Sequence, residues 1–225
     1  MSNVLVDLIP FIIGGMVVPV QLIIMLMLLK NPQNATQKGL LFFTGLTVVR
    51  LLQGIVFGLI LNIGASGKNE DGKGVIVSTL LLVLGILLLI SAYKKFTKQP
   101  DPEDETPKWM ENVVSASGFR TFLYGIQLPL MSPKLWVFML SAIGTIAVAQ
   151  LGRTLSYSTF LVFVLLTQAI LLLLMMIRLL LPKNAVSILT SASTWLANNN
   201  RTIMIVFSLV FGIYFTYQGI YGLTA

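Results

Sequence analysis

Six apolar runs of about twenty residues or more make up most of this chain and limit what it can fold into. They occupy residues 4–29, 39–65, 75–93, 119–149, 157–181 and 202–223. Crossing roughly 30 Å of hydrocarbon takes about 20 helical residues, and a spanning backbone must satisfy its hydrogen bonds within the protein. We therefore predict an all-α fold, a polytopic membrane protein with six transmembrane helices.

Composition excludes several functional classes. Of the 225 residues, 56% are hydrophobic and only 10% are charged, which is too apolar for a soluble surface. The chain has no cysteine and no histidine, so thiol chemistry is excluded and the commonest metal ligand is missing. We expect no enzyme activity, no metal and no cofactor.

A charged segment over residues 96–117 divides the chain into two halves. Residues 1–95 and 118–225 each hold three of the predicted helices. The segment reads as a solvated cytoplasmic linker, with a short interfacial helix near Trp109.

The distribution of basic residues predicts the orientation of the chain. Ten lie near the first, third and fifth connections: Lys30, Lys38, Lys94, Lys95, Lys98, Lys108, Arg120, Arg178, Lys183 and Arg201. The opposite side has Lys68, Lys73 and Arg153. The positive-inside rule then places the linker in the cytoplasm and both termini outside the cell membrane. This explains the net charge of +7 without nucleic acid as a partner.

Each half contains three spans, so the second half must enter the membrane with the opposite orientation to the first. This predicts a 3+3 inverted repeat. The first helix of each half carries prolines near its middle: Pro10 and Pro19 in the first, Pro129 and Pro133 in the fourth. Proline removes a backbone donor and clashes with the preceding turn, so we expect both helices to be broken at proline. Paired broken helices are the best sequence pointer to a transporter's binding site.

Two positive charges lie deep inside the predicted spans, away from their ends. Arg50 is near the centre of the second run, and Lys134 directly follows Pro133. A central arginine costs about 2.5–3.5 kcal/mol to insert, so it usually faces a partner or a cavity. Two alternatives stay open: carbonyls freed at the breaks could satisfy Arg50, and Lys134 could reach an interface. No acidic residue lies at comparable depth, so the sequence offers no evident proton relay.

We predict a midplane substrate site between the two broken helices. Its candidate residues are Arg50, Lys134, Pro19, Gln21, Pro133, Ser132, Gln53, Thr47 and Gln168. The two cations favour an anionic group, and the otherwise apolar lining favours an amphipathic, lipid-like molecule over a small cation.

Motifs in both halves resemble a known family. They are residues 18–23 (Val-Pro-Val-Gln-Leu-Ile), 28–32 (Leu-Leu-Lys-Asn-Pro), 38–45 (Lys-Gly-Leu-Leu-Phe-Phe-Thr-Gly) and 132–138 (Ser-Pro-Lys-Leu-Trp-Val-Phe). The first three resemble the start of glycolipid-addressing proteins, which belong to the lysine-exporter superfamily. The last resembles that superfamily's Asn-Pro-Lys element, although Ser132 replaces the asparagine and Gln21 stands where a second proline is common.

The resemblance implies an exporter. Its substrates are amino acids in the larger superfamily and cell-envelope lipids or glycolipids in the addressing branch. Our first hypothesis is therefore a transporter of an anionic or amphipathic substrate. An amino-acid exporter and a non-transporting membrane subunit that binds lipid or a partner protein are the alternatives. Membrane lipids are expected partners, and a homo-oligomer is left open.

Overall fold

A computed structural model describes residues 2–31, 34–61, 70–97, 112–113, 115–181 and 184–224, and the regular elements in these ranges are all α-helices. The helices are α1 (Ser2–Met16), α2 (Pro19–Lys30), α3 (Ala35–Ile60), α4 (Glu70–Thr97), α6 (Gly118–Leu130), α7 (Pro133–Val148), α8 (Arg153–Thr167), α9 (Ala169–Leu180) and α10 (Ala185–Thr224). Most of the predicted linker, including Trp109 and its interfacial helix, lies outside the described residues.

Three helices are each long and apolar enough to cross a membrane: α3, the part of α4 from Gly74 to Thr97, and α10. Three further pairs pass the same test together but are bent at a short break, by 52° between α1 and α2, 72° between α6 and α7, and 55° between α8 and α9. The described part of the chain therefore has three candidate spans, or up to six if each bent pair is one span. Its described part is all-helical, as predicted, and it has the helices of an integral membrane protein.

The first two bends have the same local construction. In each, two residues separate the helices and the second helix begins with proline, Pro19 in α2 and Pro133 in α7. The residue before each proline is extended, with φ/ψ of −98°/98° at Val18 and −102°/101° at Ser132. Proline disfavours helical dihedrals in the residue before it and fits the first helical position, where its missing N–H has no intrahelical acceptor.

The other two prolines do not end their helices. Pro10 lies inside α1, which continues to Met16, and Pro129 lies in the last turn of α6. Pro10 therefore does not interrupt the first segment, since α1 continues for six residues beyond it.

The third bend has no proline, and the sequence did not predict it. Residues 157–181 were expected to form one helix, but the structure separates α8 from α9 at Gln168, whose φ/ψ are −109°/5°. The Thr167 hydroxyl donates to the Val164 carbonyl at 2.8 Å, and Gln168 Nε2 donates to the same oxygen at 3.4 Å. Polar side chains here compete with the backbone for a helical acceptor, which favours a bend.

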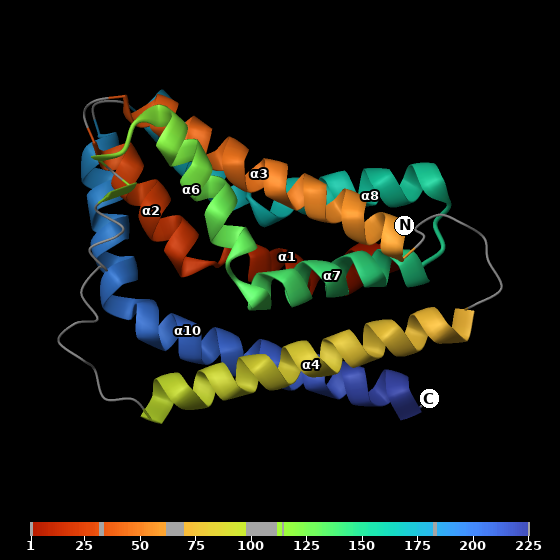
Figure 1. Cartoon of the computed structure of the whole chain (residues 1–225). Helices are drawn as coiled ribbons and strands as arrows, with labels where there is room; N and C mark the ends of the chain where they lie inside the picture. Colours follow the sequence, from red (N-terminus) through yellow and green to blue (C-terminus); the bar gives the residue numbers. More distant parts are fainter. Residues whose placement is uncertain are drawn as a thin grey trace.

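The last helix is much longer than the span predicted over residues 202–223. It begins at Ala185 and has 40 residues. Its first part is held by burial, since Ala185, Leu189 and Leu196 join the apolar core formed by α2, α3 and α9. In Figure 1 this helix changes direction along its length, running first beside α2 and then beside α4.

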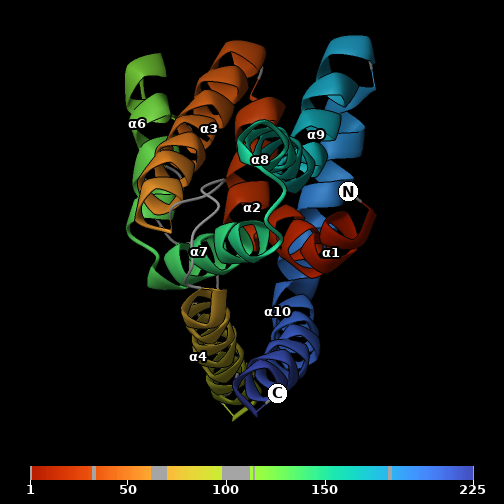
Figure 2. The same cartoon turned by 90° about the vertical axis from the view of Figure 1, so that its right-hand side faces the viewer.

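Close helix contacts hold the bundle together. A Cβ on Gly45 of α3 would meet the Phe122 carbonyl of α6, and one on Gly125 of α6 would meet the Phe42 carbonyl of α3. Gly85 of α4 and Gly212 of α10 form a similar seam between their helices. Figure 2 shows α3 and α6 side by side and the α4–α10 pair at the opposite edge, with α1 and α7 between them. Small residues at such seams let helix backbones approach closely.

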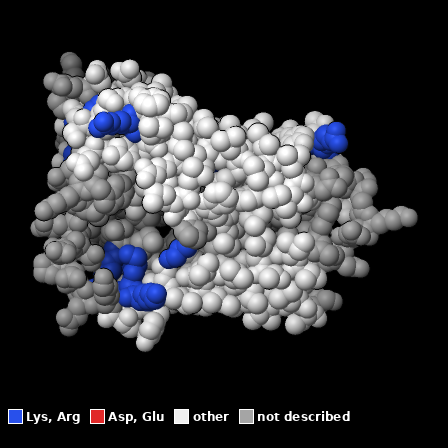
Figure 3. Space-filling view, viewed as in Figure 1, with Lys and Arg blue, Asp and Glu red and all other residues white. Residues whose placement is uncertain are grey.

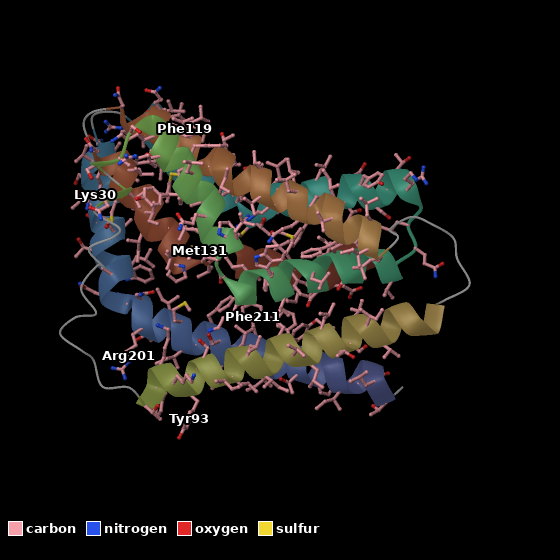
Figure 4. The ribbon with its side chains drawn as sticks, viewed as in Figure 1. Lys30, Tyr93, Phe119, Met131, Arg201 and Phe211 are labelled. Atoms are coloured by element: carbon pink, nitrogen blue, oxygen red, sulfur yellow. The ribbon has the colours of Figure 1, made fainter. Side chains whose placement is uncertain are left out.

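The described basic residues are unevenly distributed. Figure 3 shows most of the visible Lys and Arg atoms at one end of the molecule and a single group at the other. In Figure 4, the labelled Lys30 and Arg201 lie at the first end, which we call the basic end. Both chain termini lie at the opposite end in Figure 1.

Candidate functional site

The bends between α1 and α2 and between α6 and α7 meet at a cavity of about 300 Å³, here called the large cavity. Residues on either side of Pro19 line it from one bend, and Ser132 and Lys134 line it from the other. Leu88 of α4 and Phe207 of α10 contribute apolar walls. The remaining polar lining residues are Gln21, Ser91, Lys95, Asn200 and Ser208.

The lining of this cavity carries positive charge. Lys134 Nζ donates to Ser91 Oγ at 2.7 Å, and Lys95 lies on the same wall. Among the described residues, none that lines this cavity is acidic. Because each charge lies beside apolar side chains, it attracts an anion more strongly than it would in bulk water. The cavity therefore suits a negatively charged group.

Two helices begin at the large cavity. Residues in the first turns of α2 and α7 line it, so the positive ends of two helix dipoles lie at the cavity. Buried hydrogen-bond donors add to this preference for a negative group. Gln21 Nε2 and Ser208 Oγ have no hydrogen-bond partner in the described part of the chain, and these side chains are only 3% and 0% exposed.

An apolar groove adjoins the large cavity. It has a volume of about 460 Å³ and runs along α10 past Val206 and Val210, both more than half exposed. Val17 and Phe207 line both the groove and the large cavity. A molecule with an anionic head and an apolar tail could contact both features at once.

Arg50 lies in a second, much smaller cavity of about 20 Å³, here called the small cavity. The side chain is 5% exposed. Its Nη1 donates to Thr167 Oγ1 at 2.7 Å and its Nη2 donates to Gln21 Oε1 at 3.2 Å. Gln53 lines the same cavity, and Gln21 lines both cavities. Both of these partners of Arg50 are side chains. The sequence analysis had considered backbone carbonyls freed at the helix breaks as an alternative.

A third cavity of about 290 Å³ lies toward the end opposite the basic end, and Asp7, Tyr214 and Gln218 line it. An aromatic cluster separates it from the large cavity. Phe138 lines the large cavity, whereas Phe11 and Phe215 line the third one. The three rings contact one another, with centroids 5.4 Å apart for Phe11–Phe138, 4.8 Å for Phe11–Phe215 and 6.4 Å for Phe138–Phe215. We call these three residues the aromatic plug.

The structure brings together some of the predicted site residues and places others nearby. Pro19, Gln21, Ser132 and Lys134 line the large cavity, and Arg50 and Gln53 line the small one. Thr47 donates to Gln168 Oε1 at 3.1 Å, a pair that lines neither of these cavities. Pro133 begins α7, and its side chain lies outside the described part.

Sequence reasoning missed the contributions of α4 and α10 to the large cavity. Lys95 was interpreted as an orientation charge, and Asn200 lies outside the six predicted runs. Ser91 and Ser208 gave no signal within their apolar runs. The polar run of residues 198–200 could have revealed Asn200, because three consecutive asparagines directly before an apolar run are unusual.

The helices long enough to cross a membrane, bent around buried polar cavities, define this chain as a polytopic α-helical membrane protein. A family model described as "Sap, sulfolipid-1-addressing protein" matches residues 8–221. The chain therefore belongs to this family, which ties it to lipid addressing. No curated protein and no solved structure matches it. The match supports the resemblance to lipid-addressing proteins drawn from the motifs.

Proposed function

We propose that this protein is a transporter that binds an anionic, amphipathic lipid in the large cavity and moves it across the membrane. The observation that carries the proposal is the joining of a cation-lined cavity, with Lys134 and Lys95, to an apolar groove on α10. The family description names a sulfolipid, an anionic amphiphile, as what that family addresses. A sulfate or phosphate headgroup would satisfy the lysines and the two helix N-termini.

The geometry favours a lipid over an amino acid. The groove is apolar and open, and it shares Val17 and Phe207 with the large cavity. An acyl chain lying along α10 would stay in contact with the bilayer while its headgroup occupies the cavity. A small cationic amino acid would gain nothing from the groove and would be repelled by Lys134 and Lys95.

We further propose that the six-span, 3+3 inverted repeat of the lysine-exporter superfamily underlies this function. Helix contacts occur in the matched pairs that such a repeat requires: α3 packs on α6 as α8 packs on α1, and α4 packs on α7 as α10 packs on α2. The nearly equal dihedrals of Val18 and Ser132 also support the correspondence of the two proline breaks. Inverted repeats allow one half to move against the other around a shared site.

The proposed orientation follows from the charges. The basic end, at Lys30 and Arg201 in Figure 4, would face the cytoplasm, and both termini would lie outside the cell membrane. Lys95 is near the C-terminal end of α4, so the large cavity lies on the cytoplasmic side of the aromatic plug. The third cavity, of nearly equal volume, lies on the other side of the plug, so each of the two cavities would be nearer to one face of the membrane.

Flux measured in proteoliposomes tests the proposal. Vesicles carry a fluorescent lipid with a sulfate or phosphate headgroup, or the zwitterionic lipid with the same tails as a control. We expect transbilayer movement of the anionic lipid, reduced about tenfold or more by Lys134→Gln. The matched control is Lys30→Gln, which removes a lysine from the basic end but not from the cavity. Equal flux for both lipids, or no effect of Lys134→Gln, would contradict it.

The same experiment separates transport from the alternative of a non-transporting subunit. Native mass spectrometry of the purified protein reports bound anionic lipid independently of flux. Binding that Lys134→Gln weakens, together with no transbilayer movement, would mean that the large cavity holds a lipid without moving it.

A further inference from the structure

Among the residues that the structure describes, Arg50 has no negatively charged partner. Its guanidinium is bonded to a hydroxyl and an amide oxygen, both neutral. Of the side chains that the structure describes, Asp7 is the one carboxylate, and it lines the third cavity. Two hydrogen bonds satisfy part of the five-donor guanidinium, but they leave its charge buried and uncompensated. Such a charge is strongly unfavourable unless an anion lies beside it.

Two further donors line the same small cavity. Gln21 Nε2 and Gln53 Nε2 have no hydrogen-bond partner among the described residues, and their side chains are 3% and 4% exposed. Gln21 presents Nε2 because its Oε1 accepts from Arg50. Thr167 keeps its own proton on the Val164 carbonyl, so its oxygen is free to accept from Arg50. Arg50 and the two amide nitrogens thus surround the cavity with donors.

We propose that the small cavity is a binding site for one monatomic anion, chloride in the cell, held by Arg50, Gln21 Nε2 and Gln53 Nε2. The volume of about 20 Å³ suits a species about the size of one water molecule, which excludes sulfate, phosphate and carboxylates. A water molecule would have to donate two hydrogen bonds as well as accept, and it would leave the charge of Arg50 uncompensated. A cation would be repelled.

The site has a consequence for its larger neighbour. Gln21 and Phe138 line both cavities. An anion held by Gln21 would fix the amide group of Gln21 at the wall of the large cavity. It would also neutralise the charge of Arg50, so that this charge would not act on a ligand in the large cavity. The anion site does not depend on the proposed transport function, since its binding can be measured on protein that moves nothing.

The test compares thermal unfolding of the purified full-length protein in sodium chloride and in sodium gluconate at equal ionic strength. A ligand that binds the native state raises the midpoint, so we expect a Tm about 2–4 °C higher in chloride, saturating with concentration. Bromide should substitute for chloride and give an anomalous diffraction peak beside Arg50. Equal Tm in both salts, with no bromide peak, would mean that the cavity holds only water and would overturn the proposal.

Three substitutions locate the effect. Gln53→Met keeps the side-chain length but removes the donors, and it should abolish the chloride increment. Gln218→Met, a matched change at a glutamine that lines the third cavity, should retain it. Lys134→Gln should also retain it, which separates this site from the large cavity. An increment that survives Gln53→Met, or is lost in Lys134→Gln, would show that chloride acts elsewhere and would overturn the assignment.

Gln53→Glu tests whether a lost chloride effect in Gln53→Met comes only from misfolding. Its carboxylate would replace the bound anion with a covalent one next to Arg50. We expect its Tm in gluconate to equal or exceed that of the wild type, with no further increase in chloride. A Tm in gluconate well below the wild-type value would contradict an anion site at this position.

Discussion

Arg50 Nη1 donates a 2.7 Å hydrogen bond to Oγ1 of Thr167, which lies 117 positions later in the chain. The bond joins α3 to the last residue of α8, immediately before the bend at Gln168. Thr47, nearly one turn earlier on α3, donates to Gln168 itself. The bend that lacks a proline is therefore the place where polar side chains of another helix contact the backbone break.

Thr167→Val tests how much this contact stabilises the fold. The change keeps the shape of the side chain but removes the acceptor from a buried guanidinium. An unsatisfied buried donor costs about 1–3 kcal/mol, more when charged, so we expect a clear loss of stability in detergent unfolding. Thr44→Val is the control, because Thr44 donates to the Leu40 carbonyl of its own helix at an exposed position. Equal losses in the two variants would mean that the Arg50 contact contributes nothing.

The helical character of the described chain followed from the sequence, and two of the bends lie next to prolines that the sequence singled out. Apolar runs of spanning length leave little choice but helix, and a proline constrains its own N–H and the dihedrals of the residue before it. Pro19 and Pro133 begin helices for this local reason. Lys134 and Gln21 were chosen as candidates because polar side chains are rare in such runs, and both line the large cavity.

The remaining features depend on contacts between distant residues. The polar pair Thr167 and Gln168 does not by itself predict a bend, and the groups of α3 that contact this pair are more than 100 positions away. Likewise, Ser91 and Ser208 look like ordinary residues of apolar helices until α4 and α10 are packed against the proline breaks. The separation of Arg50 from Lys134 into two cavities also required the packed structure, because both residues carry the same sequence signal.

The α3–α6 seam should be intolerant of side chains. A Cβ on Gly125 would meet the Phe42 carbonyl and lie 3.2 Å from the Gly45 Cα, and backbone cannot move aside as a flexible side chain can. We expect Gly125→Val to cost about 1–3 kcal/mol of unfolding free energy. Gly74→Ala is the control, since a Cβ there would have nothing within 4 Å and should be neutral or slightly stabilising. A Gly125→Val variant as stable as the control would contradict the close approach.

Arg201 should stabilise the end of α4. Its Nε donates to the Lys95 carbonyl at 3.1 Å and its Nη2 to the Phe96 carbonyl at 3.3 Å, where the helix has carbonyls without intrahelical partners. We expect Arg201→Gln to cost about 1–2 kcal/mol and to speed hydrogen exchange in the last turn of α4. Arg201→Lys should recover part of the lost stability, because lysine restores the positive charge but not the planar guanidinium that bonds two carbonyls. Unchanged exchange in that turn would rule out this capping role.

The aromatic plug should control passage between the cavities on its two sides. Phe215 is fully buried, with its ring centroid 4.8 Å from that of Phe11. Phe215→Ala would remove the ring that closes this gap, and we expect leak of a small anionic dye from proteoliposomes to rise several-fold, with a stability loss of about 3–5 kcal/mol. Phe42→Ala is the matched control, because Phe42 is equally buried but belongs to the other apolar core. It should lose similar stability without leaking.

Phe138→Trp fills the plug instead and should slow lipid flux while leaving lipid binding in place. Leak that appears equally in the Phe42 and Phe215 variants would show that it comes from general loosening of the bundle, and the plug would then have no gating role.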